Sequence, residues 1–216
     1  MISSEDTAKR SLPECFGFYS VLTDPIKGYD YLTSLLVDNG MPVVQLRMKG
    51  VSDEIIIKTA LRMRKITDGT GTRLIINDSP RIAVEVAADG VHIGQSDISY
   101  EDARKIVGDD MLIGISTHNP QQTRAACLLQ PDYIGIGPVF TTPTKKIPDP
   151  PIGLSGMKEM LALSTVPAVC IGGIDLDNLP RVLEYGAKNF CMVRQFTQSE
   201  NPAAVLREIA QSRFRT

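Results

Sequence analysis

Short apolar runs rich in valine and isoleucine recur along this chain, and amphipathic segments separate one run from the next. Runs of this kind are typical of parallel strands, which are buried on both faces and joined by helical crossovers. Eight occur within 216 residues: FGFYSVLT (16–23), PVVQLR (42–47), RLIIND (73–78), GVHIG (90–94), MLIGIST (111–117), DYIGIG (132–137), PAVCIGG (167–173) and NFCMV (189–193). This alternation predicts an α/β protein whose parallel sheet is covered by helices.

The intervening segments have the spacing of amphipathic helices. They span residues 53–66, 79–88, 119–129, 153–163, 177–187 and 201–214. Several begin with Ser, Asp or Asn followed by proline or an acidic residue, as helix starts do. Eight strand–helix units in a chain of this length fit a compact TIM (β/α)8 barrel. A doubly wound open sheet is the alternative, but its dinucleotide fingerprint is incomplete, because no third glycine follows Gly135 and Gly137 at the required spacing.

The composition is that of one ordinary globular domain, with 43% hydrophobic and 22% charged residues. We expect a flexible N-terminal arm over residues 1–13 and a catalytic barrel over residues 14–216. A net charge of -2 argues against a nucleic-acid partner, and no apolar run is long enough to span a membrane. The four cysteines lack metal-ligand spacing and no signal-peptide pattern opens the chain, so we expect a soluble cytoplasmic protein. The sequence leaves open whether the protein forms a homo-oligomer.

In a barrel, residues at the carboxyl ends of the strands face one mouth, where active sites lie. Gln45, Arg47 and Lys49 follow one another at a spacing of two, so they share one face of their strand. A solvated strand face is one interpretation of this pattern. A barrel strand is buried on both sides, however, and unpaired buried cations are costly. A bound anion would remove that cost, so we expect an anion site here.

Two carboxylates follow the next two strands at the same mouth. Asp78 comes after Asn77, and Asp97 comes after Gln95. Each carboxylate alone could cap the helix that follows it. Together, beside two cations, they suggest a Mg²⁺ site, because Mg²⁺ is commonly held by a few carboxylates and a substrate polyphosphate. Zinc is not expected, since the chain has only two histidines and no suitably placed cysteine.

The remaining strand ends add hydroxyl, imidazole and glycine groups. Ser116 and His118 close the fifth run; His118 could act as a general acid or base or could simply start a helix, whereas His92 is expected to pack within or beneath the site. The glycine pair 172–173 and Val193 end the last two runs, where barrels often bind phosphate through backbone N–H groups. A plain strand-to-helix turn at the glycines is the alternative.

These groups form two anion-binding halves, one suited to a diphosphate and one to a monophosphate, and no nucleophile–base pair stands out. The pattern suits a reaction in which a diphosphate leaves and a second phosphorylated molecule takes its place, with catalysis by positioning and charge stabilisation. The loop TTPTKKIPDPP after the sixth run carries Lys145. Its prolines limit the freedom of the unfolded loop, which suits a lid over the mouth.

The chain resembles the thiamine phosphate synthase family. The matching elements are QLRMKG, IINDSPRIAVEVAADGVHIGQSD, GISTH, DYIGIGPVFTTPTKK and IGGID followed by Asn178, and they cover roughly residues 40–195 in order and spacing. The resemblance implies that 4-amino-5-hydroxymethyl-2-methylpyrimidine diphosphate is joined to a thiazole monophosphate, which gives thiamine phosphate and diphosphate. It further implies a dissociative, Mg²⁺-assisted reaction, in which the pyrimidine methylene becomes a cation before the thiazole nitrogen attacks.

The resemblance also implies roles for individual residues. Asp78 and Asp97 would hold Mg²⁺. The pyrimidine diphosphate would be bound by Gln45, Arg47, Lys49, Asn77, Ser116 and Lys145. The thiazole phosphate would be received by Thr142, Thr144, Gly173 and Val193. The groups expected to act on the departing diphosphate, and so to be catalytic, are Arg47, Lys49, Ser116 and Lys145.

Two positions depart from the family pattern. Arg194 stands where the family commonly has Ser, so it would either add a phosphate contact or obstruct the thiazole site, and Pro143 separates the two threonines of the loop. Three other functions stay open at this point. They are a thiazole tautomerase, which shares the barrel and the Ser116–His118 element, a Schiff-base aldolase using Lys145, and a non-catalytic phosphate-binding barrel. The joint presence of Asp78, Asp97 and Lys145 favours the synthase.

Overall fold

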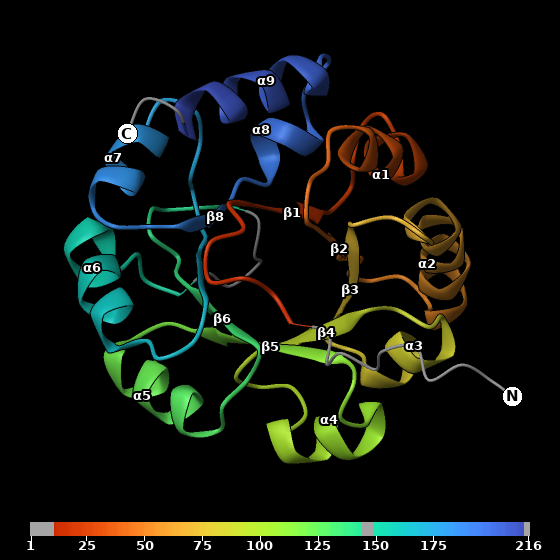
Figure 1. Ribbon diagram of the computed structural model, residues 1–216, viewed down its shortest axis with the longest axis horizontal. Coiled ribbons are helices and arrows are strands. Elements are labelled where there is room, and N and C mark those ends of the chain that lie inside the picture. The colour runs from red at the N-terminus through yellow and green to blue at the C-terminus, as the bar shows by residue number, and fades with distance from the viewer. Residues whose placement is uncertain (1–10, 144–148, 214–216) are drawn as a thin grey trace, which may run out of the picture.

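The computed structural model describes residues 11–143 and 149–213, and in it eight parallel strands close into a barrel in chain order. Figure 1 shows the strands at the centre and the helices around them. The strands are β1 (Phe18–Leu22), β2 (Val43–Leu46), β3 (Arg73–Asn77), β4 (Gly90–Ile93), β5 (Leu112–Thr117), β6 (Tyr133–Ile136), β7 (Ala168–Cys170) and β8 (Asn189–Cys191). Pairing of β1 with β8 closes the ring, with Phe18 opposite Phe190. The TIM barrel prediction is confirmed, and the open sheet is wrong.

The helices that cover the barrel lie in the intervals between strands. They are α1 (Tyr29–Asp38), α2 (Asp53–Thr67), α3 (Pro80–Glu85), α4 (Tyr100–Val107), α5 (Pro120–Leu128), α6 (Gly153–Leu163), α7 (Leu179–Glu184), α8 (Arg194–Thr197) and α9 (Pro202–Arg213). The sequence patterns did not predict α1 or α8, whereas α4 is the helix expected after Asp97. In α1 the start signal is missing, because its N-cap is Gly28 and forms no side-chain cap bond. The single turn of α8 is too short to show a period.

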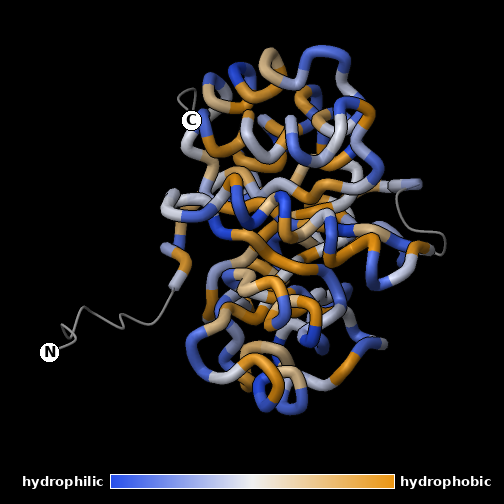
Figure 2. Tube along the Cα trace, turned by 90° about the vertical axis from the view of Figure 1, so that its right-hand side faces the viewer, coloured by the Kyte–Doolittle hydropathy of each residue, from blue (hydrophilic) through white to orange (hydrophobic). Residues whose placement is uncertain are grey.

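The apolar side chains form two cores. One lies inside the barrel and includes Tyr19, Ile75, Tyr133 and Val169, which come from strands around the whole ring. The other, larger core lies between the sheet and the helices. In Figure 2 the hydrophobic segments accordingly gather in the middle of the molecule. Of the arm expected over residues 1–13, residues 1–10 lie outside the described part, and Leu12 is buried against the core inside the barrel.

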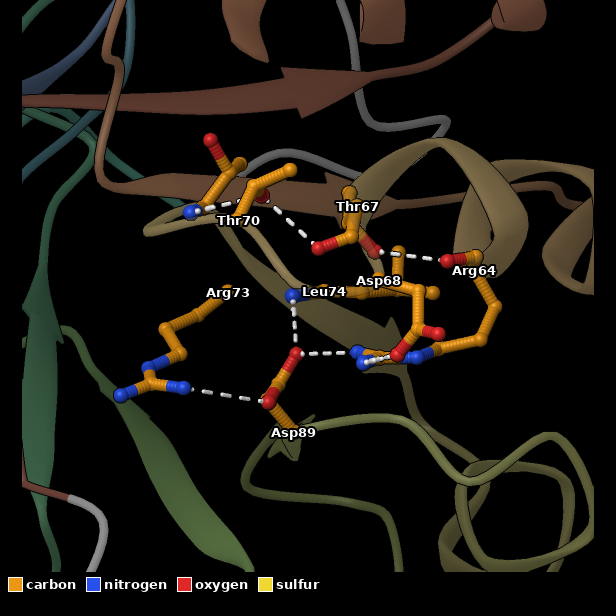
Figure 3. Close-up of polar contacts among 8 residues, drawn as sticks. Arg64, Thr67, Asp68, Thr70, Arg73, Leu74 and Asp89 are labelled. Carbon is orange, nitrogen blue, oxygen red and sulfur yellow. Dashed lines mark hydrogen bonds and ion pairs between the residues drawn. The ribbon is translucent and has the colours of Figure 1, made fainter.

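At the amino-terminal end of the strands, a buried carboxylate ties neighbouring elements together. Asp89 precedes β4, is only 2% exposed, and accepts hydrogen bonds from the backbone N–H of Leu74 (2.9 Å) and from Arg64 (2.8 Å). Arg73 contacts its other oxygen at 3.5 Å, as Figure 3 shows. Asp132 repeats this arrangement one strand pair further on, where it accepts from the N–H of Ile113. These carboxylates brace the end of the barrel opposite the predicted mouth.

Candidate active site

The main pocket lies at the carboxyl ends of the strands, where the sequence places the site. Seven of the predicted site residues line it: Gln45, Arg47, Asn77, Ser116, Thr142, Gly173 and Val193. Lys49, Asp78 and Asp97 lie beyond the strand ends at the same mouth, outside this lining. Thr144 and Lys145, together with the middle of the expected lid, lie outside the described residues.

One wall of the pocket, from β2 to β5, is polar. It carries Gln45 from β2, Arg47 directly after β2, Asn77 from β3, His92 from β4 and Ser116 from β5. The guanidinium of Arg47 has one hydrogen-bond partner within the described residues, the hydroxyl of Thr23 at 3.5 Å, and no carboxylate of that part of the chain pairs with it. A half-buried cation without a counter-charge, facing a pocket, is the chemistry of an anion site.

The opposite wall, from β6 to β8, is apolar and rich in glycine. Gly172 and Gly173 have φ values of 101° and 63°, which side chains rarely adopt. A Cβ on Gly172 would lie 2.4 Å from the Cβ of Pro138, and one on Gly173 would lie 2.7 Å from the Cβ of Phe140. The close approach of the loops after β6 and β7 therefore requires both glycines. It also leaves the backbone after β7 exposed to the pocket, as a phosphate site needs.

Lys49, Asp78 and Asp97 form a charged cluster at the mouth. Lys49 pairs with Asp78, whose backbone has a φ of 64° and donates to the carbonyl of His92 (2.8 Å). Burial raises the pKa of Asp78, the Lys49 ammonium opposes that rise, and the neighbouring Asp97 adds to it. Asp97 accepts from the N–H of Gly94 at 2.7 Å.

Neither carboxylate is a helix cap. The hydroxyl of Ser79 caps α3 by accepting from Ile82, and that of Ser99 caps α4 by accepting from Asp102. The capping interpretation of Asp78 and Asp97 is therefore wrong, and both carboxylates are available at the mouth. In the described ranges, no three or more His, Cys, Asp or Glu side chains are grouped so that they alone could hold a metal ion. Two carboxylates suit a cation that takes its other ligands from water and phosphate oxygens, as Mg²⁺ does.

Sequence reasoning missed two tyrosines at the floor of the pocket. Tyr19 and Tyr133 line it, and their hydroxyl groups lie 2.7 Å apart. The period-two pattern could have found Tyr133, because Gly135 and Gly137 on the same face of the segment also line the pocket. His92 packs at the same depth, as predicted.

The structure places His118 in the lining of the pocket and Arg194 outside that lining. His118 lines the pocket and donates from Nδ1 to the carbonyl of Gly137 (2.5 Å), while the cap of α5 is Asn119. Arg194 does not line this pocket. It lines a separate surface groove with Asp177, formed by the segment before α7 together with α8 and α9. Its expected effect on the thiazole site, as a phosphate contact or as an obstruction, stays a prediction.

The sequence of this chain is similar to those of one family of known proteins. The family model for thiamine monophosphate synthase matches residues 26–196. The chain is 39% identical over 192 residues to the thiamine-phosphate synthase of Clostridium novyi, covering 89% of this chain and 86% of that one. It is 35% identical over 177 residues to the thiamine-phosphate synthase of Lawsonia intracellularis, covering 82% of each chain.

A solved structure shares the fold. Thiamine phosphate pyrophosphorylase from Pyrococcus furiosus superposes with a TM-score of 0.82 at 24% identity, covering 91% of this chain and 95% of that one. No helix in the described ranges has the length and apolar character that crossing a membrane requires. The family model covers most of the barrel, including the polar pocket at the carboxyl ends of its strands. This chain therefore belongs to the thiamine monophosphate synthase family.

Proposed function

We propose that this protein joins a pyrimidine diphosphate to a thiazole monophosphate, releasing diphosphate and forming thiamine phosphate. The observation that carries the proposal is Arg47 on the polar wall of the pocket, which no carboxylate of the described residues pairs with, beside the Lys49–Asp78–Asp97 cluster. Family membership supports the same reaction. The two contrasting walls suit two substrates that meet in one pocket.

The polar wall would take the pyrimidine diphosphate. Arg47 offers a planar set of donors that matches phosphate oxygens, and Asn77 and Ser116 add neutral donors. Lys49 would exchange part of its contact with Asp78 for a phosphate oxygen once a second cation shares that carboxylate. Lys145, on the loop after β6, is proposed as a further cation for the diphosphate.

The apolar wall would take the thiazole phosphate. Its phosphate would be bound by the backbone N–H groups of Gly173 and Val193, at a site of the kind that barrels form after their last two strands. The apolar side chains of Ile171 and Val193 would pack on the thiazole ring. Thr142 and Thr144 are proposed to contact the same substrate where the two halves meet.

Asp78 and Asp97 are proposed to hold Mg²⁺. When bound, Mg²⁺ supplies a positive charge that stabilises the leaving diphosphate. The raised pKa of Asp78 supports this role, because burial disfavours its charged form and the neighbouring Asp97 adds to the rise, and a bound cation would offset both effects.

The chemical step breaks one bond and forms one. The C–O bond between the pyrimidine methylene and the diphosphate breaks, and its electron pair leaves with the diphosphate. Arg47, Lys49 and Lys145 would stabilise that departing charge, and Ser116 would donate a hydrogen bond to it. The lone pair of the thiazole nitrogen then forms the C–N bond. No protein nucleophile is needed for this step, in which Ser116 only donates a hydrogen bond.

We also propose that the protein works in the cytoplasm on small-molecule substrates. No disulfide joins the four cysteines, which all lie in the described residues, and this suits a reducing compartment.

The test is to incubate the purified protein with both substrates and Mg²⁺, and to measure thiamine phosphate and diphosphate. We expect equal amounts of both products, and none when either substrate or Mg²⁺ is absent. Asp78→Ala should lower turnover at least 100-fold, because it removes a metal ligand. The matched control is Asp109→Ala, since Asp109 is an exposed carboxylate before β5, at the opposite end of the barrel.

No product under any of these conditions would overturn the proposal. Interconversion of thiazole tautomers without any pyrimidine diphosphate would instead identify the isomerase alternative. Full activity of Asp78→Ala at limiting Mg²⁺ would contradict the metal role alone.

A further inference from the structure

Five polar side chains form one line of hydrogen bonds across the floor of the pocket. The Nε2 of Gln45 donates to the hydroxyl of Tyr19 (2.8 Å), and that hydroxyl lies 2.7 Å from the hydroxyl of Tyr133. The Tyr133 hydroxyl lies 3.1 Å from Nδ1 of His92, and Nε2 of His92 lies 2.9 Å from the Oγ of Ser116. Four strands besides β2 therefore contribute to a line that ends at Ser116, on the polar wall.

The part of this line from Gln45 to Tyr133 is sealed from solvent and held in place. Gln45 and Tyr19 are each 3% exposed and Tyr133 is 1% exposed. The ring of Tyr133 lies over Gly114, where a Cβ would come within 2.1 Å of its Cζ, and it stacks on His92 with ring centres 5.5 Å apart. Burial raises the pKa of both tyrosines, so both hydroxyls keep their protons at neutral pH.

The donors and acceptors give the line a direction. An amide nitrogen only donates, so the oxygen of Tyr19 accepts from Gln45. The Tyr133 oxygen is the acceptor that the described residues offer to the buried Tyr19 proton, so that proton points to Tyr133. The Tyr133 oxygen then accepts, and its own proton points to Nδ1 of His92. That nitrogen must be unprotonated, which places the ring proton on Nε2, where it is donated to Ser116. The Ser116 oxygen therefore accepts the hydrogen bond from Nε2 of His92, and the Ser116 hydroxyl proton can point into the pocket.

We propose that Tyr133, with Tyr19 and Gln45 behind it, is a positioning residue that holds His92 as the Nε2–H tautomer and turns the Ser116 hydroxyl toward the substrate as a donor. The reverse direction would bind the Ser116 proton to His92 and offer the substrate only an acceptor. A departing diphosphate oxygen carries negative charge and needs a donor. The donation from Ser116 to a departing diphosphate rests on the function proposed above. The tautomer of His92 is independent of that function.

The tautomer is measured by long-range ¹H–¹⁵N NMR on protein with ¹⁵N-labelled histidine at neutral pH, without substrates. The chain has only two histidines, so both rings can be assigned. We expect His92 to be protonated on Nε2, with an Nδ1 that accepts a hydrogen bond. His118 is an internal reference, because the carbonyl of Gly137 can only accept and so requires a proton on Nδ1 of His118.

In Tyr133→Phe, which keeps the ring over Gly114, the Nδ1 signal of His92 should move to that of a nitrogen without a hydrogen bond. The matched control is Tyr31→Phe, a half-exposed tyrosine on α1, which should leave both histidines unchanged. A proton on Nδ1 of His92 in the unmodified protein would overturn the proposal. So would an unchanged Nδ1 signal in Tyr133→Phe.

The effect on turnover is measured by a double-mutant cycle. Tyr133→Phe should lower kcat about tenfold, the equivalent of one hydrogen bond, and leave KM for the pyrimidine diphosphate unchanged. In a Ser116→Ala background the same change should have no further effect, because Tyr133 acts through Ser116. Equal losses in both backgrounds would refute the positioning role. If thiamine phosphate is never formed while His92 behaves as expected, the line of hydrogen bonds stands and the proposed function falls.

Discussion

The carboxylate of Asp89 offers a strong test of how the barrel is held together. It is buried at the end opposite the pocket and binds Arg64, Arg73 and the backbone N–H of Leu74. Replacement with alanine removes all three contacts at once. The change should weaken the fold and leave the pocket intact, since no residue of this group lines the pocket.

The magnitude follows from what each partner can do after the carboxylate is lost. Arg64 retains its bond to Asp68 (2.8 Å), and the side chain of Arg73 is 35% exposed, so both cations keep water or a carboxylate. The N–H of Leu74 would have neither water nor another acceptor, because Leu74 is fully buried. A buried donor without a hydrogen bond lowers the free energy of unfolding by about 1–3 kcal/mol. With the lost charge-assisted bonds, we expect Asp89→Ala to lower the free energy of unfolding by about 3 kcal/mol.

The assay is urea unfolding followed by far-ultraviolet circular dichroism, because the chain has no tryptophan for fluorescence. With a slope of ~3 kcal/mol per molar urea, the midpoint should fall by about 1 M. Asp89→Asn is the matched control: its amide oxygen still accepts from Leu74, so the midpoint should fall by less than half as much. Equal midpoints for Asp89→Ala and the unmodified protein would refute this reasoning, as would equal losses for the alanine and asparagine variants.

Three further predictions concern the pocket and the buried thiols. Gly173→Ala should lower both stability and affinity for the thiazole phosphate, because its φ of 63° and the contact with Phe140 exclude a Cβ. Arg47→Met should raise the urea midpoint of the ligand-free protein by the equivalent of ~0.5–1 kcal/mol and weaken inhibition by diphosphate about 10–100-fold, since it removes an uncompensated cation. Burial raises the thiol pKa of Cys170 and Cys191 from 9.0 to about 12, so unfolded chains lose these protons first and stability should fall as pH rises from about 9 to 12.

Each of these has a control and a contrary result. Gly69→Ala changes a glycine of positive φ with open space around it, so it should affect stability alone; equal effects of both changes on substrate affinity would contradict the role of Gly173. For Arg47, Arg62→Met on the exposed surface should leave inhibition by diphosphate unchanged, and an equal loss there would contradict the anion site. For the thiols, Cys170→Ala should reduce the fall of the free energy of unfolding between about pH 9 and 12. An unaltered dependence of stability on pH would contradict the role of the Cys170 thiol.

The sequence determined the class of fold, because apolar runs at crossover spacing leave a parallel sheet few ways to bury both faces. It also determined which polar residues end the strands, and in a barrel all strand ends of one kind meet at one mouth. Gln45, Arg47, Asn77 and Ser116 were found in this way, and they line one pocket. These inferences succeeded because they depend on local period and chain order alone.

Only the tertiary structure decided how the side chains pair. Asp78 and Asp89 are both aspartates beside a strand, yet one faces the mouth and the other braces the opposite end, according to which end of its strand each occupies. Tyr19 and Tyr133 are 114 residues apart and meet only because the barrel closes and Gly114 leaves room for a ring. A hydrogen bond across the inside of a closed sheet leaves no local pattern in the chain, so its partners appear only once the strands are in register.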